Sequence, residues 1–68
     1  MVLSDWTVTR KQKYPTHYSY ELMRDDFPHL LYVTVSDNSY LFHMPNRFSK
    51  SVTANSLEEA MGMIDEPQ

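Results

Sequence analysis

The clearest pattern in the chain is an alternation of apolar and polar positions over residues 30–44, LLYVTVSDNSYLFHM. A period of two is typical of strands with one buried face, and it runs through two segments joined by Asp37 and Asn38. If these two residues form the loop, Ser36 lies opposite Ser39 and every residue shares a face with its partner. The predicted inner face carries Leu31, Val33, Val35, Tyr40, Phe42 and Met44, and the outer face carries Tyr32, Thr34, Leu41 and His43. The pattern therefore predicts a β-hairpin with a well-specified register.

The loop of this hairpin is the less regular part of the prediction. Two-residue loops favour Asn-Gly or Asp-Gly because their residues adopt positive φ, whereas Asp37 and Asn38 both carry side chains. A four-residue loop over 36–39 is the alternative. Pro45 and Asn46 then end the second strand.

The segments before the hairpin have weaker patterns. Residues 6–9, WTVT, predict a short first strand with Trp6 and Val8 on one side, or an N-terminal arm packed by the tryptophan. The polar stretch that follows, with Pro15, predicts a loop. Residues 16–24, THYSYELMR, alternate and predict a second strand, while a helix stays open as the competitor because YELMR contains good helix formers.

Two further segments complete the expected sheet. Asp25 and Asp26 before Phe27 and Pro28 predict a connection into the hairpin, with Phe27 filling the end of the sheet. Residues 47–53, RFSKSVT, predict another short extended piece.

A helix is predicted to begin at Leu57. Ser56 and Glu59 have the capping-box spacing, and acidic residues suit the positive end of the helix dipole. Pro67 is expected to end the run, and Gly62 falls on the face away from the core, where fraying or a close partner would explain it. The apolar stripe of this helix consists of Leu57, Ala60, Met61 and Ile64.

Together these elements predict one α+β domain over residues 1–68: an antiparallel meander of three or four strands with a C-terminal helix packed on one face. The other face of the sheet is then left uncovered, with part of the strand that holds Tyr18, Tyr20 and Met23 adjoining it. An uncovered face of this kind invites a partner.

The composition narrows the function classes. The chain has 68 residues and no cysteine, so neither disulfides nor a thiolate zinc site can stabilise it, and a substrate pocket is hard to build at this size. The histidines His17, His29 and His43 have no metal-ligand spacing, and no nucleophile signature or glycine-rich phosphate loop is present. We therefore expect no enzyme, no cofactor and no metal. The N-terminus has no signal-peptide pattern and no window approaches a membrane span, which predicts a cytoplasmic protein without membrane contact.

The charges are distributed unevenly about a net value of −3. Basic residues dominate residues 6–24, and acidic residues dominate from Asp37 onward. The basic segment interleaves cations with aromatic rings, a combination that could pair phosphates and stack bases. The acidic total argues against nucleic acid as the first choice. The candidate nucleic-acid residues are Arg10, Lys11, Lys13 and Tyr14.

The order of strand, strand and then SVTANSLEEAMGMIDE resembles the sheet-and-helix half of HicB-type antitoxins, in which a capped helix packs against three strands. The likeness covers about half of the chain. Two features of those antitoxins, the glycine-rich segment before the helix and the appended DNA-binding domain, have no counterpart in this sequence. It implies an architecture, and no functional residue is carried over from it.

The expected function is a small protein-binding regulator or inhibitor, such as an antitoxin-like or phage-encoded accessory protein, that acts through a sheet face or edge. Its partner is another protein or a second copy of the chain. A nucleic-acid-binding module is the alternative. The candidate partner-binding residues are Tyr18, Tyr20, Tyr32, Leu41 and His43.

Overall fold

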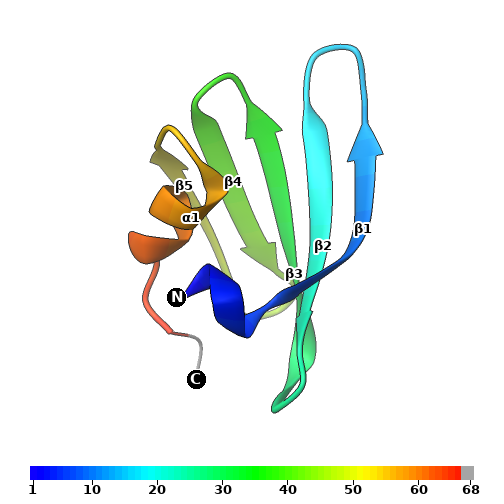
Figure 1. The fold of residues 1–68 in the computed structure, drawn as a ribbon, viewed down its shortest axis with the longest axis vertical. Helices are drawn as coiled ribbons and strands as arrows, with labels where there is room; N and C mark the ends of the chain where they lie inside the picture. The colour runs from blue at the N-terminus through cyan, green and yellow to red at the C-terminus, as the bar shows by residue number, and fades with distance from the viewer. Residues whose placement is uncertain (67–68) are drawn as a thin grey trace.

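The computed structural model describes residues 1–66, which form an antiparallel five-stranded sheet with its strands in chain order and a short helix on one face (Figure 1). The elements are η1 (Leu3–Asp5), β1 (Thr7–Lys13), β2 (Tyr18–Arg24), β3 (Phe27–Ser36), β4 (Ser39–Met44), β5 (Phe48–Thr53) and α1 (Leu57–Gly62). The predicted α+β meander with a C-terminal helix is confirmed. The number of strands is higher than the three or four expected, because both outer segments of the chain pair fully.

The central hairpin of β3 and β4 has the register that the alternation predicts. Ser36 pairs with Ser39, Val35 with Tyr40 and Thr34 with Leu41. The loop is the two-residue form, and Asp37 adopts the positive φ of 52° that such a loop requires. The inner residues, from Leu31 and Val33 to Met44, are buried.

The first strand differs from the prediction. Residues 10–13 were expected in a loop, yet β1 continues through them to Lys13 and pairs with β2. Every residue of β1 is exposed, because the strand lies at the edge of the sheet beyond the reach of the helix. An edge strand can be polar on both sides, so a search for alternating apolar residues does not detect it.

The next segment, Tyr18–Arg24, is a strand, and the competing helix is excluded. A tight turn at Asp25 and Asp26 leads directly into β3, so the expected connection is shorter than residues 25–28. Phe27 opens β3 and packs half-buried against the core, with its ring 6.2 Å from that of Trp6. It therefore does fill this end of the sheet.

A second turn joins β4 to β5. The Arg47 N–H donates to the Met44 carbonyl at 3.0 Å, which leaves Pro45 and Asn46 at the centre of the turn. Asn46 has φ of 63°, a value suited to the position after proline in a type II turn. The prediction that these two residues end the strand is confirmed.

The helix α1 begins where its cap predicts. The Ser56 hydroxyl accepts from the Glu59 N–H at 3.1 Å, and Ala60, Met61 and Ile64 of the apolar stripe are buried against the sheet. The helix ends at Gly62, an exposed position where an added Cβ would meet nothing within 4 Å. The predicted stop at Pro67 lies outside the described residues.

The N-terminal segment also covers the sheet. Met1 and Trp6 are buried, and η1 packs against α1 (Figure 1). The Met1 amino group donates to the Met61 carbonyl at 2.9 Å and to that of Ile64, which places a cation at the negative end of the helix. We call this side of the sheet the covered face, and the opposite side the open face.

Candidate functional site

The open face is centred on two cross-strand pairs of β3 and β4. Tyr32 lies opposite His43 and Thr34 lies opposite Leu41, as the alternation predicts. The side chains of Tyr32 and Leu41 are 39% and 41% exposed. This surface is therefore an aromatic and aliphatic patch that nothing in residues 1–66 covers.

Strand β2 extends the open face as predicted, but not through the two tyrosines that were expected to bind a partner. The tyrosines Tyr18 and Tyr20 pair with Val35 and Val33, so both point to the covered face and lie half-buried against the core. Glu21, which pairs with Tyr32, and the exposed Met23 lie on the open face instead. The five candidate partner-binding residues thus divide into Tyr32, Leu41 and His43 on one face and the two tyrosines on the other.

The covered-face tyrosines form a cluster with Tyr40. Tyr18 and Tyr20 meet edge to face, with 5.5 Å between ring centroids. Burial, reinforced by the neighbouring Tyr18, Tyr20 and Glu59, raises the pKa of the Tyr40 hydroxyl. Tyr40 therefore stays neutral and acts in packing, and this cluster stabilises the fold near α1.

The basic segment does not form one surface. Arg10 pairs with Glu21 on the open face, whereas Lys11 and Lys13 pair with the two covered-face tyrosines. The Lys11 ammonium lies 5.4 Å from the centroid of each tyrosine ring, a cation–π geometry. Tyr14 lies at the hairpin tip and stacks on His17 at 4.6 Å. Alternation along the strand thus separates the cations that the sequence places together.

An ion-pair network joins the end of β2 to the segment after α1. Arg24 donates to Asp26 at 2.6 Å and to Glu66 at 2.7 Å. The hydrogen bond from Arg24 lowers the pKa of the Asp26 carboxyl. The Arg24 guanidinium also lies 6.0 Å from the centroid of the Trp6 ring, at the edge of the core. We therefore assign this network a role in stabilising the fold.

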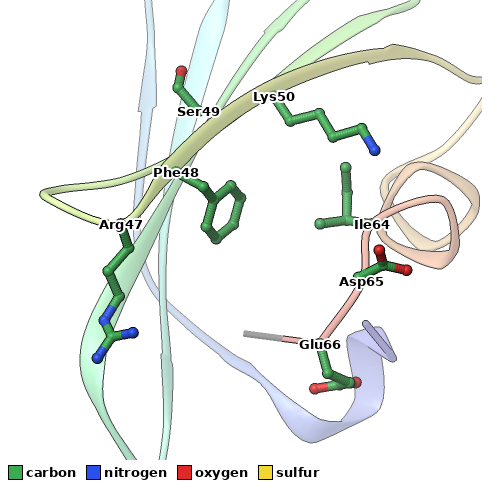
Figure 2. A pocket seen from close by; sticks show the side chains of 7 residues that line it. All are labelled: Arg47, Phe48, Ser49, Lys50, Ile64, Asp65 and Glu66. Atoms are coloured by element: carbon green, nitrogen blue, oxygen red, sulfur yellow. The ribbon is translucent and has the colours of Figure 1, made fainter. Parts of the chain in front are cut away.

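A hollow of about 360 Å³ lies beside β5 (Figure 2). The sequence does not predict this hollow. The ring of Phe48 and the side chain of Ile64 face each other across it, with Lys50 and Asp65 at its rim. Each of the two apolar residues has a strand or helix pattern of its own, but no local pattern shows that they meet. The lining residues are Arg47, Phe48, Ser49, Lys50, Ile64, Asp65 and Glu66.

The remaining candidates for chemistry are dispersed. Within residues 1–66, no three histidine, aspartate or glutamate side chains gather as metal ligands would. His17 lies at a hairpin tip, His29 lies against the Phe27 ring at 5.2 Å, and His43 lies on the open face. No helix in this part of the chain has the length and apolar character needed to cross a membrane.

Comparisons with known proteins leave the residues and their geometry as the basis for any functional inference. They also lend no support to the likeness to HicB-type antitoxins. A scan against protein-family models, a search of curated proteins and a search of solved structures each found no match to this chain.

Proposed function

We propose that the chain is a small, cytoplasmic, non-enzymatic regulator or inhibitor that binds another protein through its open face. The observation that carries the proposal is the exposed apolar patch formed by Tyr32 and Leu41, which are diagonal neighbours on the adjacent strands β3 and β4. Aromatic and large aliphatic side chains of this kind provide most of the binding energy in protein interfaces.

Residues around the patch suit the rim of an interface. Met23 and Leu30, both exposed, extend the apolar patch itself at one end of the sheet. Ser49 and Ser51 flank it on β5, where they pair with His43 and Leu41. Small polar residues around an apolar centre match the usual arrangement of an interface core and rim.

A nucleic-acid-binding module is the alternative, and one row of side chains favours it. Arg10, Glu21, Tyr32 and His43 lie opposite one another across four strands, so a cation, an aromatic ring and an imidazole share the open face. Lys11 and Lys13 project to the covered face, so they cannot contact the phosphates of a nucleic acid bound on the open face. The division of the cations is the reason that the protein partner ranks first.

The test compares aromatic and charge removal against the same ligand. The full chain would be used to capture partners from its native host, and retained protein and nucleic acid would be measured by mass spectrometry and absorbance. Binding of the dominant protein would then be measured for Tyr32→Ala, Leu41→Ala and a triple Arg10/Lys11/Lys13→Ala variant. We expect each single variant to weaken binding by about tenfold or more and the triple variant to do less, because desolvated anchors outweigh rim charges.

A matched control separates this effect from general loss of apolar surface. Met63 is 46% exposed but follows α1, away from the open face, so Met63→Ala should leave binding unchanged. Steeply salt-dependent retention of single-stranded nucleic acid, abolished by the triple variant, would instead establish the alternative. Sedimentation over a range of concentrations distinguishes a second copy from a different protein as the partner.

A further inference from the structure

The two edge strands of the sheet differ in how they meet solvent. β1 carries Arg10, Lys11 and Lys13, and its register shifts between Val8 and Arg10, as at a β-bulge. Charges and bulges are the features that protect an edge from pairing with another strand. β5 keeps an unbroken register from Ser39–Thr53 to Met44–Phe48 and has Lys50 as its charged residue. The β5 edge therefore lacks the protection that β1 has.

The backbone groups of β5 that face outward can be identified. The Ala54 N–H donates to the Asn38 carbonyl at 2.9 Å, which makes these two residues a hydrogen-bonded pair. Hydrogen-bonded pairs alternate along an antiparallel ladder, so Phe48, Lys50 and Val52 bond to β4. The N–H and C=O groups of Ser49, Ser51 and Thr53 then point away from the sheet, and none of them has a backbone partner within residues 1–66.

The hollow of Figure 2 opens beside this edge on the covered face. A strand added to β5 would place every second side chain on the covered face, next to Phe48 and Lys50. The Phe48 ring and Ile64 provide an apolar contact for one such side chain. Lys50 forms no ion pair with any residue of 1–66, so the position two residues farther along the added strand would meet an ammonium that no carboxylate contacts directly.

We propose that the β5 edge binds an extended peptide segment of a partner protein, in which a large apolar residue enters the hollow and an acidic residue two positions away faces Lys50. Backbone hydrogen bonds to Ser49, Ser51 and Thr53 supply affinity, and the hollow and Lys50 supply specificity. Of the two carboxylates that line the hollow, Glu66 is paired with Arg24 and Asp65 forms no ion pair with Lys50 within residues 1–66, so neither occupies the position of the peptide carboxylate. This site is separate from the open face, so the proposal can fail without affecting the function proposed above, and the reverse also holds.

A second copy of the chain fits this edge poorly. If β5 paired with itself about a two-fold axis at Lys50, the two lysines would lie directly opposite each other. With the axis at Ser51, the two lysines would be diagonal neighbours on the same face, still within reach of long side chains. Both arrangements bring like charges together beside the hollow, whereas an acidic peptide neutralises Lys50.

The probe is a capped seven-residue peptide, Thr-Thr-Thr-Leu-Thr-Glu-Thr, in which leucine and glutamate fall on one side of an extended strand. It would be titrated into the ¹⁵N-labelled full chain while amide shifts and hydrogen exchange are recorded. We expect saturable shifts at millimolar peptide in residues 48–53, and slower exchange at Ser49 and Ser51. The matched peptide with lysine in place of glutamate should bind at least about fivefold more weakly because it repels Lys50.

Three protein variants complete the test. Ser51→Pro removes an outward donor and leaves the ladder to β4 intact, since proline is tolerated where the N–H faces out of the sheet. We expect it to weaken peptide binding by about tenfold or more relative to Ser51→Ala. Lys50→Glu should reverse the preference between the two peptides, a result that loss of folding cannot produce.

Three results would overturn the proposal. The first is an absence of saturable shifts up to millimolar peptide, and the second is a response confined to β1 or the open face. The third is a change in the shifts of residues 48–53 alone on dilution without peptide, which would show that a second copy occupies the edge. None of these results bears on the binding of Tyr32 and Leu41 to a partner.

Discussion

Leu41 and Phe42 are neighbours on β4, yet they belong to two faces of the sheet with opposite environments. The side chain of Phe42 is 0% exposed beneath α1, whereas that of Leu41 is 41% exposed on the open face. The covering layer comes from the two chain ends, through Met1 and Trp6 at one and α1 at the other (Figure 1). Within residues 1–66 the covering segments lie on one face, and the apolar residues of the other face stay exposed.

The largest expected effect comes from removing the covering layer. A chain that ends at Asn55 lacks α1 and with it Ala60, Met61 and Ile64, which are buried on the sheet. Burial of each large side chain contributes about 1.5–3 kcal/mol, which is comparable to the whole stability of a domain this small. We expect loss of cooperative thermal unfolding, measured by circular dichroism.

A control for this truncation keeps the helix and changes its solvent side. Glu58→Ala alters an exposed residue of α1 and should melt cooperatively like the parent chain. Cooperative melting of the truncated chain would mean that α1 is not required to cover the sheet.

The second effect is measured on the two neighbours themselves. Phe42→Ala leaves a cavity in the covered face and should lower the free energy of unfolding by about 3–5 kcal/mol. Leu41→Ala should lower it by much less, about 1 kcal/mol or under, because Leu41 is 41% exposed on the open face and its removal leaves no buried cavity. Urea denaturation gives both values, and Phe42→Leu provides a milder change if Phe42→Ala does not fold. Equal losses for the two alanine variants would show that both faces are buried in solution.

The sequence predicts the parts of this fold in which one local pattern determines the outcome. The register of β3 and β4 follows from alternation, because a slip by one residue would move Val33 and Phe42 into water. The start of α1 follows from the reach of the Ser56 hydroxyl to the Glu59 N–H. The open-face residues Tyr32, Leu41 and His43 follow from the same alternation as the core.

The features that the sequence does not predict depend on contacts between distant segments. Strand β1 beyond Thr9 has no apolar alternation, and it forms because β2 supplies the hydrogen-bonding partner. The faces of Tyr18 and Tyr20 depend on how β2 pairs with β3, which their own strand does not specify. The hollow beside β5 requires Phe48 and Ile64 to meet. Pairing and packing of this kind are tertiary, so no single window of sequence contains them.

The smallest expected effect concerns the Arg24 network, which joins the two ends of the covering layer. Because the hydrogen bond from Arg24 lowers the Asp26 pKa, the unfolded chain binds more protons than the folded one as the pH falls toward acid. The stabilisation is therefore complete above the ordinary aspartate pKa of about 4, and it is lost as the pH falls through the lower value of the folded state. Urea midpoints for the parent chain and Asp26→Asn should differ slightly at neutral pH and converge in acid. Asp25→Asn removes the same charge one residue away, at an exposed site with no ion pair within residues 1–66, and should show no such convergence. A constant difference between the parent chain and Asp26→Asn across this pH range would mean that the Asp26 carboxylate does not contribute through its ion pair with Arg24.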